Sequence, residues 1–155
     1  MKRDAIVKKV MSAVFAIIIA ISCAGSVFAA DIKELTAAAE AGDANAQREL
    51  GVAYSNGVGV EQDYAKAAEL FLKAAEQGHA VAQYDLASMY NMGFGVKKDF
   101  VTAYMWMTVA AMTDPNNQEV KELREMAAMG RPAAKIEEAE SKAKAKFEEI
   151  VRRKK

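Results

Sequence analysis

The sequence predicts an all-α protein built from stacked pairs of helices. Three observations support this fold class. The 155 residues are rich in alanine and contain only two prolines, and alanine favours helices whereas proline interrupts them. Apolar residues recur at helical spacing along most of the chain. A block of 36 residues also occurs twice in fixed register, which is typical of a single domain built from repeats.

The repeat is found by comparing the chain with itself at a shift of 36 positions, which aligns residues 42–77 with residues 78–113 and Glu40 with Glu76. Fourteen positions are identical across this shift, and the alignment contains no gap. One such unit cannot bury its apolar face alone, so the copies are expected to stack. The identical residues, each matched 36 positions later, are Glu40, Gly42, Ala44, Ala46, Gln47, Leu50, Tyr54, Gly57, Gly59, Val60, Asp63, Ala67, Ala74 and Ala75.

Each copy predicts a helix, a glycine-rich turn and a second helix. Ala46, Leu50 and Tyr54 recur every four residues and therefore share one face of the first helix. The two glycines of Gly57-Val58-Gly59-Val60 can adopt positive φ, which suits a tight reversal. Asp63 follows this turn, and its carboxylate is expected to cap the second helix by accepting a hydrogen bond from a free backbone N–H.

The segments that flank the two copies also predict helices. Residues 30–41 are expected to form the second helix of a truncated preceding repeat. Residues 114–155 are expected to form a degenerate repeat and a C-terminal capping helix with a basic tail. The residues predicted to face inward are Val120, Leu123, Met126 and Ala127 in the degenerate repeat and Ile136, Ala139, Ala143, Phe147 and Ile150 in the capping helix.

Residues 1–29 have the layout of a secretory signal peptide. Basic residues precede an uncharged run at 10–21, and Val27-Phe28-Ala29 fits the small-residue rule for cleavage after Ala29. The run is shorter than the roughly twenty residues of a membrane-spanning helix, so we expect a periplasmic or secreted protein. The alternative is a lipoprotein anchored at Cys23, because Ala20-Ile21-Ser22-Cys23 loosely resembles a bacterial lipidation site.

The residue counts exclude several classes of function. The chain has one cysteine and one histidine, so a disulfide framework and a histidine-based metal site are excluded. Its 21 basic residues balance its 21 acidic residues, which argues against a nucleic-acid partner. We expect no cofactor, no metal and no catalytic residue. The lone His79 is expected to have a structural role at the start of a helix.

Two other functions remain open alternatives. Ser141 and Lys144 match the Ser-x-x-Lys motif of penicillin-recognising enzymes, which would suit a small exported hydrolase or β-lactam-binding protein. The Ser-Asp-Asn and Lys-Thr-Gly motifs that accompany it are missing from the sequence. Seven methionines lie between Met89 and Met129, and thioethers can bind Cu(I) in a methionine-rich carrier. The commoner use of methionine is adaptable packing.

The repeat resembles the Sel1-like repeat (SLR), a relative of the tetratricopeptide repeat. The resemblance rests on Ala-Gln-x-x-Leu-Gly-x-x-Tyr at 46–54, Gly-Val-Gly-Val at 57–60, Asp63 and Lys-Ala-Ala-Glu-Gln-Gly at 73–78. The second copy departs mildly, with Ala87 in place of a glycine. The resemblance implies a right-handed α-solenoid of antiparallel helix pairs, whose first helices line a concave surface. It also implies membership of a family of adaptors and scaffolds, whose exported bacterial members are associated with envelope signalling, complex assembly and host interaction.

The resemblance therefore implies a non-enzymatic module that binds a protein or peptide partner. By analogy with tetratricopeptide grooves, the binding residues are those of the first helices that turn away from the packing face. The alternative is that these residues are ordinary solvated surface. Tyr84 is the strongest single candidate, because exposed aromatic residues favour interfaces. The predicted residues are Asn45, Arg48, Val52, Ser55 and Asn56 in the first copy and Val81, Tyr84, Ser88, Asn91 and Met92 in the second.

Overall fold

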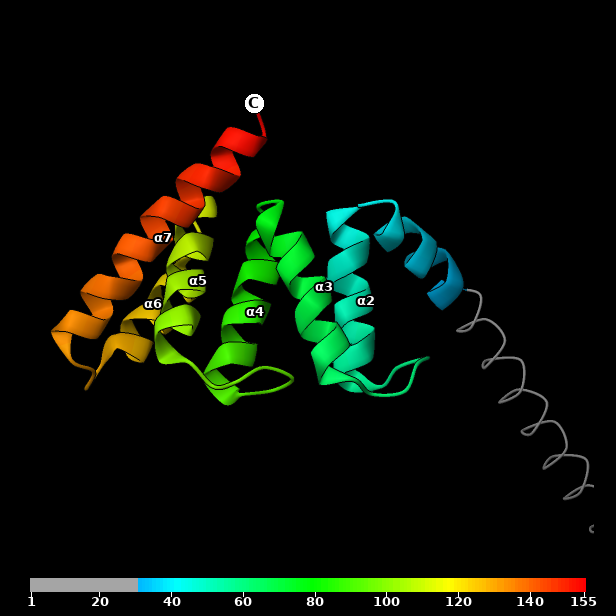
Figure 1. Cartoon of the computed structure of the whole chain (residues 1–155), viewed down its shortest axis with the longest axis horizontal. Helices are drawn as coiled ribbons and strands as arrows, with labels where there is room; N and C mark the ends of the chain where they lie inside the picture. The colour runs from blue at the N-terminus through cyan, green and yellow to red at the C-terminus, as the bar shows by residue number, and fades with distance from the viewer. Residues whose placement is uncertain (1–30) are drawn as a thin grey trace, which may run out of the picture.

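The computed structural model describes residues 31–155, so the predicted signal peptide and Cys23 lie outside the described residues. Between residues 31 and 155 there are seven helices and no strand, which confirms the all-α prediction. None of these helices combines the length and apolar character needed to cross a membrane. A helix at 31–40 is followed by α2 (Ala44–Asn56), α3 (Tyr64–Glu76), α4 (Ala80–Met92), α5 (Phe100–Thr113), α6 (Gln118–Ala128) and α7 (Ala133–Arg153) (Figure 1).

Consecutive helices pair and stack along the length of the molecule (Figure 1). Helix α2 packs on α3 and α4 packs on α5, which gives one antiparallel pair for each repeat. Contacts between α3 and α4 join the two pairs, and both α6 and α7 pack on α5. The helix, turn, helix units predicted from the sequence are therefore present in both copies.

The glycine-rich turns have the predicted backbone conformation. The φ angles of Gly57 and Gly59 are 69° and 73°, and those of their matches Gly93 and Gly95 are 79° and 66°. Gly95 has a second role, because a Cβ atom there would lie 2.2 Å from the carbonyl carbon and oxygen of Tyr64. The turn of the second repeat thus rests directly on the backbone at the start of α3.

The helix caps follow the repeat. The carboxylates of Asp63 and Asp99 accept hydrogen bonds from backbone N–H groups in the first turns of α3 and α5, as predicted. Asp43 caps α2 in the same way. His79 stands 36 residues after Asp43 and caps α4, its Nδ1 accepting a hydrogen bond from the N–H of Ala82 at 3.2 Å. The structural role predicted for His79 is therefore confirmed.

The main core lies between the two repeats and under α7. It is built from small alanines of α3 and α4 and from larger side chains such as Phe71, Leu86 and Trp106. Helix α7 contributes Ala143 and Ile150 from its predicted apolar face. The small side chains let neighbouring helices approach closely, so the buried aromatic residues fill the remaining space.

Helix α6 buries less surface than predicted. Val120 is buried and packs against α5, and Leu123 and Ala127 are half-buried against the core. The side chain of Met126 is 55% exposed, so its predicted inward placement is wrong. The reason is that α5 is the main packing partner of this short helix, so only a narrow stripe of α6 is covered.

Two buried glutamines link successive helix pairs. The Nε2 atoms of Gln47 and Gln83 donate hydrogen bonds of 3.0 Å to the carbonyl oxygens of Ala39 and Ala75, in the last turns of the preceding helices. The Oε1 atom of Gln47 accepts from Nε2 of Gln77 at 2.7 Å. The Oε1 atom of Gln83 is buried with no hydrogen-bond partner among residues 31–155. These bonds explain why glutamine recurs at this position of the repeat.

Candidate functional site

Helices α2 and α4 line two neighbouring hollows, which share Asp85 and together are called the groove. We call one the α6 hollow, because residues of α6 form part of its wall, and its volume is about 290 Å³. We call the other the turn hollow, because Phe94 of the glycine-rich turn lines it, and its volume is about 330 Å³. The α6 hollow is lined by Arg48, Ala80, Val81, Tyr84, Asp85, Ala110, Asp114, Asn117, Glu119 and Val120. The turn hollow is lined by Val52, Ser55, Asn56, Tyr64, Phe71, Asp85, Ser88, Met89 and Phe94.

The structure brings seven of the ten predicted binding residues into the groove. Three predicted residues lie outside it. The Oδ1 atom of Asn45 is 3.1 Å from Nε2 of His79, and Asn91 and Met92 are exposed near the end of α4. The seven that line the groove are Arg48, Val81 and Tyr84 in the α6 hollow and Val52, Ser55, Asn56 and Ser88 in the turn hollow.

An ion pair joins α2 to α4 within the groove. The Nε atom of Arg48 donates to Oδ2 of Asp85 at 2.8 Å, and the two side chains are 33% and 21% exposed. Asp85 was not predicted as a site residue. Its separation from Arg48 exceeds the repeat period by one residue, which places the two on adjacent first helices. Opposite charges at this separation are a signal that sequence reasoning could have used.

Tyr84 forms part of the wall of the α6 hollow. Its side chain is half-buried and packs against a small core cluster of Ala110, Ala111 and Val120. The aromatic ring is therefore less exposed than predicted from the sequence. Packing of α4 on α5, with Val120 of α6 in the same cluster as the ring, accounts for this, because it turns a helix surface into the side of a cavity.

A pair of stacked aromatic rings borders the turn hollow. The ring centroids of Tyr64 and Phe94 are 4.9 Å apart, with an angle of 23° between the planes. Phe94 is 42% exposed and comes from the glycine-rich turn of the second repeat. Neither ring was predicted as a site residue. An aromatic residue between the two turn glycines, where the first repeat has Val58, is the sequence signal that could have identified Phe94.

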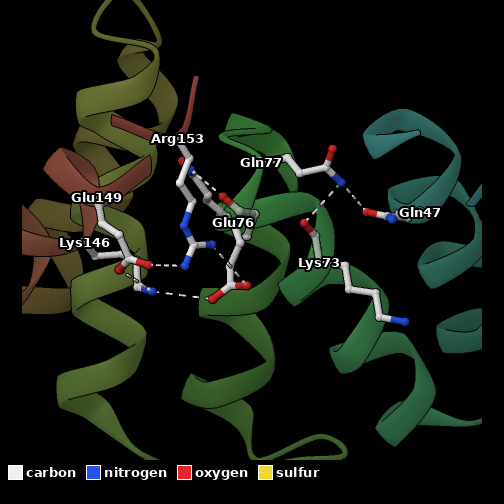
Figure 2. A network of polar contacts seen from close by, with 9 residues as sticks. Gln47, Lys73, Glu76, Gln77, Lys146, Glu149 and Arg153 are labelled. Carbon is white, nitrogen blue, oxygen red and sulfur yellow. Dashed lines mark hydrogen bonds and ion pairs between the residues drawn. The ribbon is translucent and has the colours of Figure 1, made fainter. Parts of the chain in front are cut away.

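A further hollow of about 530 Å³ lies between the end of α3 and α7, but its acidic groups are paired. Figure 2 shows Lys146 between Glu76 and Glu149, with Nζ to Oε distances of 3.4 and 3.0 Å, and Arg153 bonded to Glu149. The hydrogen bond from Lys146 lowers the pKa of Glu149 below its usual value. We therefore assign these residues to the attachment of α7 to α3.

Among the residues behind the two alternative functions, Met89 lines the turn hollow and the others lie apart from the groove. Ser141 and Lys144 are exposed on α7. The methionines divide between core and surface, so they do not share one environment. Residues 31–155 hold no group of three or more His, Cys, Asp or Glu side chains suited to a metal ion. Met89 and Met107 are buried, Met105 and Met112 are half-buried, and Met92, Met126 and Met129 are exposed.

Comparison with known proteins identifies the repeat. The family model of the Sel1 repeat matches residues 44–79 and 80–112. A crystal structure of a protective antigen of uropathogenic Escherichia coli, which displays an SLR fold, is similar with a TM-score of 0.74 and 33% identity, over 79% of this chain and 26% of the antigen. A Sel1 repeat protein from Oxalobacter formigenes is similar with a TM-score of 0.60 and 30% identity, over 79% and 38%. No curated protein matches the chain.

The two matched segments contain the helix pairs α2 with α3 and α4 with α5. Both similar structures have the solenoid fold of this repeat, and the chain spans well under half of their lengths. Sel1 repeats are typically protein-interaction modules. The chain therefore contains two Sel1 repeats, and its helices form a solenoid of the Sel1-repeat type.

Proposed function

We propose that the chain is an exported, non-enzymatic interaction module that binds a segment of a protein or peptide in the groove. The observation that carries this proposal is the groove itself, in which two hollows adjoin at Asp85 and draw on both repeats. An extended segment is the ligand that fits a surface of this kind. The site of action is the periplasm or the extracellular space, with a lipid anchor at Cys23 as the alternative.

The groove offers hydrogen-bond acceptors to such a segment. The hydroxyl groups of Ser55 and Ser88 donate to the carbonyl oxygens of Val52 and Tyr84, at 2.9 and 3.1 Å. Since each hydroxyl oxygen has two lone pairs, it can still accept a bond from an N–H group of the partner. Apolar walls beside these hydroxyls supply the area that can be buried on binding.

Site-specific photocrosslinking tests the groove. A benzophenone amino acid replaces Val81, which is 45% exposed in the α6 hollow, or Lys144 on the exposed surface of α7 as the control. We expect a defined partner to crosslink from position 81 and not from position 144. The product should disappear when Ser88→Arg fills the turn hollow and so blocks the path of the segment, with circular dichroism showing intact helices. Equal crosslinking from both positions would contradict the proposal.

Cell fractionation tests the location. We expect the protein in the periplasm or medium, with an N-terminus at Ala30 by mass spectrometry. Cys23→Ser should leave both results unchanged if cleavage follows Ala29. Release of the protein from a membrane fraction by Cys23→Ser would instead support the lipid anchor. Recovery from the cytoplasm with residues 1–29 intact would refute export.

A further inference from the structure

The chemistry of the groove points to the kind of segment that it binds. We propose, on the basis of the proposed function, that the α6 hollow receives a Lys or Arg side chain of the partner. A bulky apolar side chain of the same segment would occupy the turn hollow. The partner is therefore a basic peptide segment with a neighbouring apolar residue, and acidic segments are disfavoured.

The charge of the α6 hollow is the first argument. Three carboxylates line it, those of Asp85, Asp114 and Glu119, against the single guanidinium of Arg48. That guanidinium already bonds to Asp85 at 2.8 Å. The hollow thus keeps an excess of negative charge, which attracts a cationic group and repels an anionic one.

Two of these carboxylates are available to a ligand. Asp114 is half-buried and Glu119 is exposed, and neither forms an ion pair with any residue between 31 and 155. An oxygen of Asp114 accepts a long bond of 3.3 Å from the backbone N–H of Asn116. A carboxylate has about four acceptor positions, so both groups can receive N–H donors from a guanidinium or ammonium group.

The shape and surface of the α6 hollow suit a long basic side chain. Val81, Tyr84, Ala110 and Val120 supply apolar surface alongside the carboxylates. Lys and Arg carry aliphatic stems that pack on apolar surface while their charged ends stay solvated. A volume of about 290 Å³ accommodates one such side chain. A compact metal ion would leave the apolar wall unused.

The start of α6 also opposes an anionic ligand. Free N–H groups at a helix N-terminus attract anions, but the N–H of Val120 is bonded to Oδ1 of Asn117 at 3.2 Å. Glu119 adds a negative charge in the same turn. The protein's own acceptor and charge therefore occupy the place where a carboxylate of the partner would otherwise bind.

The turn hollow calls for an apolar neighbour. Its walls include Val52, Phe71, Met89 and the exposed ring of Phe94. Asp85 borders both hollows, so side chains that occupy them belong to nearby residues of one extended segment. The combination predicts a short recognition motif rather than a general preference for positive charge.

A phage-displayed library of random dodecapeptides, panned on the full chain, tests this inference. We expect Lys or Arg next to a bulky apolar residue in the binders retained by the wild type. The Asp114→Asn, Glu119→Gln double variant should lose this enrichment. The matched control is Glu122→Gln, Glu125→Gln, which removes the same charge from exposed residues of α6 outside the groove.

Synthetic peptides from the panning then give affinities by fluorescence anisotropy. Replacing the basic residue by Glu should weaken binding by about tenfold or more at low salt, and the groove variant should weaken the parent peptide by a similar factor. The control variant should bind like the wild type. All variants share residues 1–30, so any binding by that segment cancels in the comparison.

The outcomes separate the inference from the proposed function. Val81→Arg places a long side chain in the α6 hollow from an exposed position. Peptides that bind the wild type but not this variant are the groove-dependent binders. Groove-dependent binders without basic residues, or a basic preference unchanged in the Asp114→Asn, Glu119→Gln variant, would overturn the inference alone. The absence of any groove-dependent binder would overturn the proposed function itself.

Discussion

Gly95 lies where the turn of the second repeat meets the backbone of Tyr64. A side chain at this position would overlap that backbone, which cannot move without displacing the start of α3. Its positive φ of 66° adds a conformational penalty for any other residue. Contact between the repeats at this point therefore requires the absence of a side chain.

We expect Gly95→Ala to lower the free energy of unfolding by about 2 to 4 kcal/mol, from overpacking and backbone strain together. Gly130→Ala is the matched control, because Gly130 has a φ of 70° but no atom within 4 Å of an added Cβ. Strain alone should cost about 1 kcal/mol there. Urea denaturation measures both, and equal losses would show that the contact with Tyr64 has no energetic importance.

The cap at Asp99 predicts a pH dependence. A hydrogen bond from the hydroxyl of Thr102 is the main cause that lowers the pKa of Asp99. Because the folded pKa lies below the unfolded one, the stabilisation is full above the unfolded pKa of about 3.9 and is lost as the pH falls through the folded value.

Asp99→Asn retains a cap but does not titrate. We expect it to lower the melting temperature at pH 7, with a free-energy cost under about 1 kcal/mol because the site is exposed. The difference from wild type should shrink below pH 4. If the difference in melting temperature between the two proteins stayed constant from pH 7 to pH 3, the carboxylate of Asp99 could not be its source.

Links between neighbouring helices depend on the buried glutamines. Gln47→Met should cost about 1 to 3 kcal/mol, because the carbonyl of Ala39 and the amide of Gln77 both lose a partner. Gln83→Met should cost less, since it also removes a buried acceptor that has no partner among the described residues. Gln118→Met, at an exposed site, serves as the neutral control. Thermal denaturation ranks the three, and a larger loss for Gln83→Met would contradict this account.

Helices, turns and caps could be predicted because each depends on local sequence. The spacing of Ala46, Leu50 and Tyr54 and the position of Asp63 determine local structure with little help from distant residues. Met126 could not be placed correctly, because its exposure depends on how many neighbours α6 has. At the end of an array, the burial of a side chain depends on whether another helix packs against it. The sequence of one helix does not contain that information.

Attachment of α7 determines whether the stack has a closed end. Helix α7 covers part of the core that contains Trp106, and its Lys146 and Arg153 form ion pairs with Glu76 at the end of α3. We expect a chain that ends at Gly130 to lose near-ultraviolet circular dichroism and to bind a hydrophobic dye, because the apolar surface under α7 becomes exposed. Removing only Lys155 is the control. Unchanged spectra after loss of α7 would show that the repeats form a stable core unaided.

The groove is a property of the whole molecule, which limits how far it could be predicted. Family resemblance located the first helices, and seven of the predicted residues do line the groove. The carboxylates of Asp85, Asp114 and Glu119 were missed because they come together only in the folded chain. They belong to α4, to the end of α5 and to α6, respectively. Asn91 and Met92 were predicted by analogy, but they lie at the end of α4 beyond the lining of both hollows.

The position of α7 also determines where the molecule can be lengthened. Its ion pairs bind Glu76, and the side chains of Ile150 and Lys154 approach Gly78, so a repeat appended after α5 would have to displace it. If a duplicate of residues 44–79 were inserted after His79, α7 would instead contact copies of Glu76 and Gly78. Engineered variants of graded length can thus be made by internal duplication, with the terminal helix retained as a common end piece.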